Sequence, residues 1–215
     1  MTARLLAALL LSGSTALFAQ SPTPTPATPQ VHSSALGFNY SIPSDWEVVD
    51  SSATLPTVQQ QVTQNATSED EKKGIACAQV ALTARHGSPP SVVVVVALPF
   101  DCFGQQMTPG DLPGFASGAS EGLKKSFDIT DPNHVTYSLG THSMWIERAK
   151  GSPLGHPDMP YTVETVCTIL KKGAVCWMAL AANDAGLQTF EHGAVTIDGE
   201  AAPALVPAGT FSKKP

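Results

Sequence analysis

Charged residues are scarce in this chain of 215 residues: Asp, Glu, Lys and Arg make up 14%, and acids outnumber bases by 18 to 12. Nucleic acid and anionic lipid surfaces need a cationic face, so neither is an expected partner. No cysteine lies in a C-x-x-C sequence, which leaves thiol-redox catalysis and zinc binding without support. We find no internal repeat. The composition is that of an acidic, soluble protein.

No hydrophobic run is long enough to span a bilayer, but the amino terminus carries a shorter one at residues 5–11. Arg4 precedes this run, and small residues follow it up to Ala19, which is the pattern that signal peptidase recognises. No cysteine follows that could accept a lipid, so we expect no stable membrane insertion after cleavage. The sequence therefore predicts an exported protein, periplasmic or secreted, with residues 1–19 as its signal peptide.

The rest of the chain divides by composition into three parts. Residues 20–35 are rich in proline and threonine, which predicts an extended, disordered linker. Residues 36–197 form one expected domain, large enough to bury its own core. Residues 198–215 are rich in alanine and proline and are expected to be a flexible tail.

Four cysteines form an even set in a chain that is predicted to leave the reducing cytosol, and this favours two structural disulfides. They are Cys77, Cys102, Cys167 and Cys176. Closeness in sequence favours Cys77–Cys102 and Cys167–Cys176, but three connectivities remain open. The second pair faces directly across a hairpin only if no bulge occurs at Gly173.

Hydrophobic periodicity predicts both helices and strands. Strands are indicated over residues 37–42, 46–49, 75–83, 92–98, 135–139, 142–149, 161–170 and 174–182. Helical spacing predicts a short helix from Leu55 that stops at Gly74, a long helix that Thr108 caps, and a last helix that Asn183 caps. The valines at residues 92–96 are apolar on both faces, so this strand should be central and covered on both sides.

We therefore expect an α+β fold: an α-β-α sandwich with a largely antiparallel central sheet and helices on both faces. Three segments also resemble the PsbP-like superfamily: G-F-N-Y-S-I-P-S-D-W at residues 37–46, G-T-H-S-M-W-I-E-R-A at residues 140–149, and the hairpin and final helix over residues 161–191. The resemblance covers residues 36–197 and implies the same sandwich. Most members are non-enzymatic accessory or binding proteins, so it implies that class of function, without a cofactor, metal or partner site.

One motif points to catalysis instead. Residues 118–122 match G-x-S-x-G, the nucleophile elbow of α/β-hydrolases, with Ser120 as nucleophile and His192 as the nearest histidine in the expected order. The elbow requires a strand that leads straight into a sharp turn. Here the motif falls inside the long predicted helix, where Ser120 is expected on the polar side beside Lys124. A serine hydrolase is thus the alternative function.

Histidines, tryptophans and one long loop are the other candidates for a metal or ligand site. His134 with His142, or His156 with Asp158, could converge on a metal, but neither pair has a recognised ligand spacing, and solvated loop histidines are the simpler interpretation. Three tryptophans could line a cleft, although each lies in a predicted strand and core packing explains them more simply: Trp46, Trp145 and Trp177. The loop over residues 151–160 is a further binding candidate.

The prediction from sequence is an exported, non-enzymatic accessory or binding protein of the periplasm or envelope. Its partner is an unknown envelope protein or small ligand, and no catalytic, cofactor or metal residue is assigned. A binding module needs an exposed apolar or aromatic patch, whereas a hydrolase needs Ser120 at an exposed turn with an imidazole in reach.

Overall fold

A seven-stranded antiparallel sheet forms the middle layer of the molecule. The computed structural model describes residues 30–33, 35–42, 45–50 and 69–211. The strand order is β3-β4-β5-β9-β8-β7-β6, and every neighbouring pair is antiparallel. These strands are β3 (Glu47–Val48), β4 (Gln79–Gly87), β5 (Pro90–Pro99), β9 (Gly173–Ala181), β8 (Tyr161–Ile169), β7 (His142–Pro153) and β6 (Phe127–Leu139).

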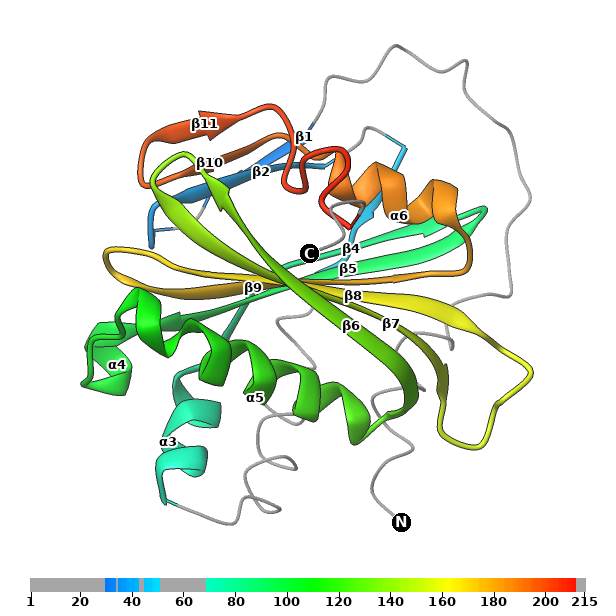
Figure 1. Cartoon of the computed structure of the whole chain (residues 1–215), viewed down its shortest axis with the longest axis horizontal. Coiled ribbons are helices and arrows are strands. Elements are labelled where there is room, and N and C mark those ends of the chain that lie inside the picture. The colour runs from blue at the N-terminus through cyan, green and yellow to red at the C-terminus, as the bar shows by residue number, and fades with distance from the viewer. Residues whose placement is uncertain (1–29, 34, 43–44, 51–68, 212–215) are drawn as a thin grey trace.

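Each face of this sheet carries a different layer (Figure 1). Helices cover the lower face: α3 (Glu69–Cys77), α4 (Phe100–Phe103) and α5 (Leu112–Lys124), the last preceded by a 3-10 turn, η1 (Pro109–Asp111). The upper face carries α6 (Asp184–Glu191) and a small sheet of order β1-β2-β10-β11. The small sheet contains β1 (Gln30–Ser33), β2 (Phe38–Ile42), β10 (Val195–Ile197) and β11 (Glu200–Ala202). The predicted α-β-α sandwich is confirmed, with the small sheet as an addition.

The main core lies between the seven-stranded sheet and the upper layer. Trp177 of β9 is fully buried there, and the Phe38 ring of β2 meets it edge to face with centroids 5.5 Å apart. Leu187 and Phe190 of α6 are buried in the same cluster, as the predicted last helix requires. Asn183 caps this helix, because its Oδ1 accepts a hydrogen bond from the Gly186 amide at 3.1 Å.

The valine-rich strand is central, but only one of its faces is fully covered. β5 lies between β4 and β9, and Val93 and Val95 are buried on the upper face. On the lower face Val92, Val94 and Val96 remain half-buried. The expected cover on both sides is therefore incomplete. The reason is the position of α5, which packs mainly against β8 and leaves part of β5 and β9 to the shorter helices α3 and α4.

The predicted capping signal forms, but it caps the 3-10 turn η1, and the α-helix α5 begins after that turn, at Leu112. Thr108 and Asp111 form a capping box, in which the Thr108 amide donates to Asp111 Oδ2 at 2.7 Å. Leu112 and Ala116 face the sheet and are buried. The helix ends earlier than expected, at Lys124, and Phe127 is instead the first residue of β6.

Several predicted boundaries are wrong. α3 continues past Gly74 to Cys77, and β1 lies inside the predicted linker. The predicted tail contributes to the core, since Leu205 and Val206 are buried and the Tyr137 hydroxyl donates to the Leu205 carbonyl at 2.7 Å. The first part of the helix expected from Leu55, up to residue 68, and the expected signal peptide lie outside the described residues. Within the described ranges, no helix has both the length and the apolar character needed to cross a bilayer.

A partly buried charge cluster connects the sheet to the upper layer. Arg148 of β7 donates from Nε to Glu164 Oε2 of β8 at 2.7 Å, and from Nη2 to Glu191 Oε1 of α6. The guanidinium carbon lies 4.1 Å from the centroid of the Phe211 ring. Glu164 is fully buried, and its Oε1 has no hydrogen-bond partner among the described residues. Two carboxyl groups therefore share one arginine, whose own side chain is 34% exposed.

From this cluster we expect the protein to become less stable as the pH rises above the acidic range. Burial raises the pKa of Glu164 to about 8 and the Glu191 carboxylate adds to the shift, against the opposing effect of Arg148. The folded state thus holds a proton that the unfolded state loses near its ordinary pKa of 4.5. We expect the free energy of unfolding to decrease between about pH 5 and pH 8. Urea titrations across this range measure it; a Glu164→Gln variant with an unchanged pH slope would contradict the assignment.

Candidate functional site

An apolar groove of about 680 Å³ opens on the lower face of the molecule, between α5 on one side and α3 and α4 on the other. None of the described side chains that line it carries a charge, a hydroxyl or an amide. They are Gly74, Ile75, Ala78, Val96, Leu98, Phe103, Gly114, Phe115, Gly118, Ala119, Gly122, Leu123, Cys176 and Met178. We refer to this feature as the apolar groove.

The floor of the apolar groove is the part of the main sheet that the helices leave uncovered. Val96 of β5 pairs with Cys176 of β9, and Met178 follows on the same face because side chains alternate along a strand. Val96 and Met178 are only half-buried, although they lie at the centre of the sheet. Apolar side chains at interior strand positions are normally covered, so their exposure marks a surface fit to receive an apolar group.

One wall of the apolar groove is a stripe of glycines along α5. Gly114, Gly118 and Gly122 recur every four residues, and residues at that spacing share one face of a helix. Among the residues that the structure describes, a Cβ atom at any of the three would meet nothing within 4 Å. The missing side chains therefore leave open space beside the helix. Phe115, Ala119 and Leu123 continue the same wall toward the sheet.

Replacing Gly122 by alanine is expected to stabilise the protein. Glycine costs about 0.5–1 kcal/mol relative to alanine inside a helix, and the added methyl group has free space. We expect an increase of about 0.5 kcal/mol in the free energy of unfolding, because Gly122 lies close to the end of α5. Urea denaturation measures this value. A loss of stability would mean that the groove wall is already packed.

Both predicted disulfides form, and both help to build the apolar groove. Cys77–Cys102 joins α3 to α4 on the outer wall, with Cα atoms 5.5 Å apart. Cys167–Cys176 links β8 to β9 beneath α5, with Cα atoms 4.2 Å apart. The two residues are direct partners in the ladder, so Gly173 introduces no bulge between them. The pairings are those that closeness in sequence favoured, and no described cysteine is free.

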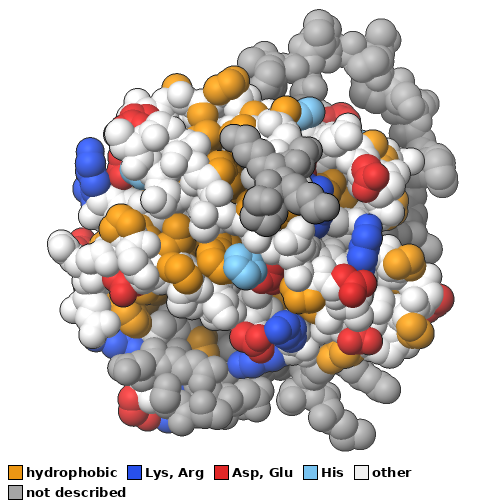
Figure 2. All heavy atoms as spheres, in the orientation of Figure 1, with side chains coloured by type: hydrophobic (Ala, Val, Ile, Leu, Met, Phe, Trp, Pro, Cys, Tyr) orange, Lys and Arg blue, Asp and Glu red, His pale blue; other side chains and the backbone are white. Residues whose placement is uncertain are grey.

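A second, smaller hollow of about 300 Å³ lies where the start of α5 meets β6 and β7. Its lining is more polar and includes Thr136, Ser138 and Ser143 beside Pro113 and Trp145. The Trp145 indole stacks on the His134 ring with centroids 4.2 Å apart. Figure 2 shows hydrophobic side chains gathered over this part of the molecule, left of centre. The hollow is smaller and less apolar than the groove.

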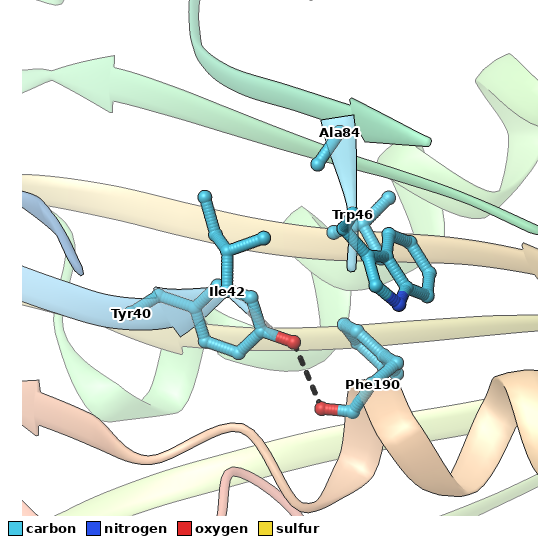
Figure 3. Close-up of a pocket in the computed structure, with 6 residues that line it drawn as sticks. Tyr40, Ile42, Trp46, Ala84 and Phe190 are labelled. Atoms are coloured by element: carbon cyan, nitrogen blue, oxygen red, sulfur yellow. Dashed lines mark hydrogen bonds between the residues drawn. The ribbon is translucent and has the colours of Figure 1, made fainter. Parts of the chain in front are cut away.

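A third feature, inside the main core, is not a binding site. Trp46, Ala84 and Ile42 surround a gap beside Tyr40 and Phe190 (Figure 3). The gap has no room for a water molecule. The Tyr40 hydroxyl donates to the Phe190 carbonyl at 2.9 Å, so its polar atom is already satisfied. This region is packed protein interior.

Ser120 does not lie at a strand-to-helix turn. It occupies the middle of α5, where it is 7% exposed, and its Oγ has no hydrogen-bond partner among the described residues. The expectation that it faces solvent beside Lys124 is wrong, because the sheet-facing row of Leu112 and Ala116 continues through Ser120. His192 follows α6, on the opposite side of the main sheet (Figure 1). The two flanking residues of the motif, Gly118 and Gly122, belong to the groove wall.

The histidine pairs do not form metal centres in the described residues. His134 lies on the face of Trp145, whereas His142 lies on the opposite face and contacts Asp198 at 3.9 Å. His134 lies in β6 and His142 in β7, so the interpretation of these two residues as loop histidines is wrong. His156 and Asp158 are exposed in the β7–β8 connection. No described group of three His, Cys, Asp or Glu residues could hold a metal.

The remaining sequence candidates have structural roles. Trp46 and Trp177 are core residues, and Trp145 is half-buried under α5. The candidate loop at residues 151–160 is shorter than expected, because β7 continues to Pro153. Leu154 in this connection is 48% exposed.

Sequence reasoning missed the apolar groove, although the four-residue spacing of glycines in α5 was visible.

The solved structures that are similar to this chain include those of two proteins. Cyanobacterial PsbP (CyanoP) from Synechocystis is 11% identical with a TM-score of 0.41, and the match covers 78% of this chain and 88% of that one. LpqN, which is involved in cell envelope biogenesis of Mycobacterium tuberculosis, is 14% identical with a TM-score of 0.39 over 77% and 78% of the two chains. No protein-family model matches the chain, and no curated protein does.

Proposed function

We propose that this chain is an exported, non-enzymatic accessory or binding protein of the periplasm or envelope, and that it holds an apolar ligand in the apolar groove. The groove is the observation that carries the proposal. It presents fourteen apolar residues around one hollow, at a place where the fold would otherwise cover the sheet. An exposed apolar hollow of this kind is typical of a binding surface.

The disulfides support an extracytoplasmic setting. Both bonds join residues that the fold brings together, and such bonds form and persist in oxidising compartments. The predicted signal peptide agrees with this location. In such a compartment, apolar molecules need a protein carrier or partner, because water solvates them poorly.

A neutral, environment-sensitive dye tests the binding function. We expect N-phenyl-1-naphthylamine to bind the purified mature protein saturably, with one site per chain and a rise in fluorescence on transfer from water to the apolar groove. Free tryptophan solution and a protein unfolded in urea serve as controls. The proposal is wrong if fluorescence rises only in proportion to dye, without saturation, or does not rise at all.

A second experiment tests the non-enzymatic part of the proposal. A buried, mid-helix serine lacks the exposed position and the imidazole that a serine nucleophile needs, so we expect no labelling of the folded protein by a fluorophosphonate probe. Labelling that disappears in Ser120→Ala would instead support the hydrolase alternative.

A further inference from the structure

We propose that the occupant of the apolar groove is the hydrocarbon chain of a free, single-chain fatty carboxylate, with its head group at the rim beside Lys73. This inference rests on the binding function proposed above and names the ligand class for the same groove. It is carried by the size of the groove, by the chemistry of its lining and by the position of one cationic side chain.

The size of the apolar groove favours a small molecule over a protein partner. Its volume of about 680 Å³ falls within the range of about 300–1,000 Å³ that is typical of small-ligand sites. Stable protein interfaces use about 20–30 residues on each side. The apolar groove has fourteen lining residues, of which five are glycines or alanines on α5 and α3 with little side chain to offer a partner.

The chemistry of the lining favours a plain hydrocarbon chain. Small-ligand sites usually place a few polar groups that fix the ligand's orientation. None of the fourteen lining side chains can supply a strong hydrogen bond. A ligand with polar atoms along its length would lose its hydrogen bonds to water without replacement, and that loss is costly. An alkyl chain has no such atoms.

One cationic side chain stands at the rim of the apolar groove. Phe103 lines the groove, and Lys73 Nζ lies 5.9 Å from the centroid of its ring. The same amine lies 3.1 Å from the position that a Cβ atom of Gly104 would occupy. Its neighbour Lys72 is paired with Glu69 at 2.7 Å. A carboxylate at the rim can therefore stay hydrated and meet the Lys73 ammonium while its chain enters the groove.

The groove fits a free amphiphile better than a lipid within a membrane. The chain has a net charge of −6, which disfavours approach to an anionic bilayer surface. The apolar groove is also a single hollow, whereas bilayer phospholipids carry two chains. We therefore assign the ligand to the pool of free fatty carboxylates.

Competition with the dye gives the test. Octanoate, decanoate and dodecanoate, each below its micelle concentration, are expected to displace N-phenyl-1-naphthylamine with affinity that rises about 15-fold per two carbons. This factor follows from about 0.8 kcal/mol for each buried methylene. Lys73→Gln should weaken decanoate binding about two- to fivefold and leave neutral decanol unchanged, since exposed ion pairs contribute little. Lys72→Gln is the matched control and should change neither.

The outcomes separate this inference from the binding function. Dye binding without displacement by any fatty carboxylate overturns the inference and leaves the binding function intact, whereas absence of dye binding overturns both.

Equal effects of Lys73→Gln on decanoate and decanol would remove Lys73 from the site and contradict the proposal. Binding to phosphatidylglycerol vesicles without displacement by decanoate would make a membrane lipid the ligand. A dimer in sedimentation experiments that Gly118→Leu dissociates would make a second copy the occupant. Either result overturns the assignment.

Discussion

Replacing Gly118 by leucine is expected to weaken dye binding at least tenfold while the protein stays folded. Gly118 lies in the middle of the open glycine stripe, and a Cβ atom there meets no atom of the described residues within 4 Å. The leucine side chain would therefore extend into the apolar groove and take the place of ligand. If the ligand can no longer bury two of its methylene groups, its affinity falls about 15-fold. Fluorescence titration of the variant gives the value.

The matched control for this variant is Ser117→Leu. Ser117 is exposed on the same helix, one residue away, but it does not line the apolar groove. The control adds the same apolar side chain to α5 without filling the hollow. Leucine also forms helix better than glycine by about 0.8 kcal/mol, so Gly118→Leu should not unfold the protein. Equal loss of binding in both variants would point to a general effect on the helix and against the groove.

Arg148→Met is expected to destabilise the protein by about 3–5 kcal/mol. Arg148 is the partner of two carboxylates, and Glu164 is fully buried. At pH 9, above the Glu164 pKa of about 8, the Glu164 carboxyl is ionised, and removal of its arginine partner leaves that buried charge uncompensated, which is costly. The variant also loses the stacking of the guanidinium on Phe211. Single domains are stable by only about 5–15 kcal/mol, so the loss would be a large fraction of the total.

A double variant distinguishes the charge from the packing. In Arg148→Met with Glu164→Gln, no buried carboxylate of β8 remains, so we expect more than half of the lost stability to return. Unfolding in urea at pH 9, where Glu164 is ionised in the wild type, compares the wild type with the single and double variants. A cost below about 1 kcal/mol for Arg148→Met, or no recovery in the double variant, would show that the cluster does not behave as a buried charge network.

The sequence predicted the features that depend on near neighbours. The capping box of Thr108 and Asp111 spans three residues, and the Asn183 cap is equally local. The pairing of Cys167 with Cys176 follows from one short hairpin. Local signals of this kind act through backbone geometry over a few residues, so they can be read without the fold.

The features that escaped prediction depend on long-range packing. Arg148 meets Glu191 across 43 residues, and the small sheet joins β2 to β10 from opposite ends of the chain. The run of valines in β5 predicts burial on both faces, because the position of α5 over the sheet cannot be inferred from the sequence of the strand. Ser120 was expected to face solvent because a serine is polar, yet its helical position places it toward the sheet.

The apolar groove itself was partly visible in the sequence. Gly118 and Gly122 were read as parts of a hydrolase motif, and their spacing with Gly114 was not considered as a helix face. Composition alone does not distinguish the two interpretations. The difference is physical: a nucleophile elbow needs a strand before the serine, whereas a groove wall needs glycines at intervals of four inside a helix.

The most direct test of the apolar groove is a ¹³C spectrum of the methionine methyl groups during titration with N-phenyl-1-naphthylamine. Met178 lies in the groove floor, whereas Met144 is fully buried on the opposite face of the sheet and serves as an internal control. Aromatic rings shift nearby methyl resonances, so we expect the Met178 signal to move saturably with dye while the Met144 signal stays in place. Saturable dye binding with an unmoved Met178 signal would contradict the groove as the binding site.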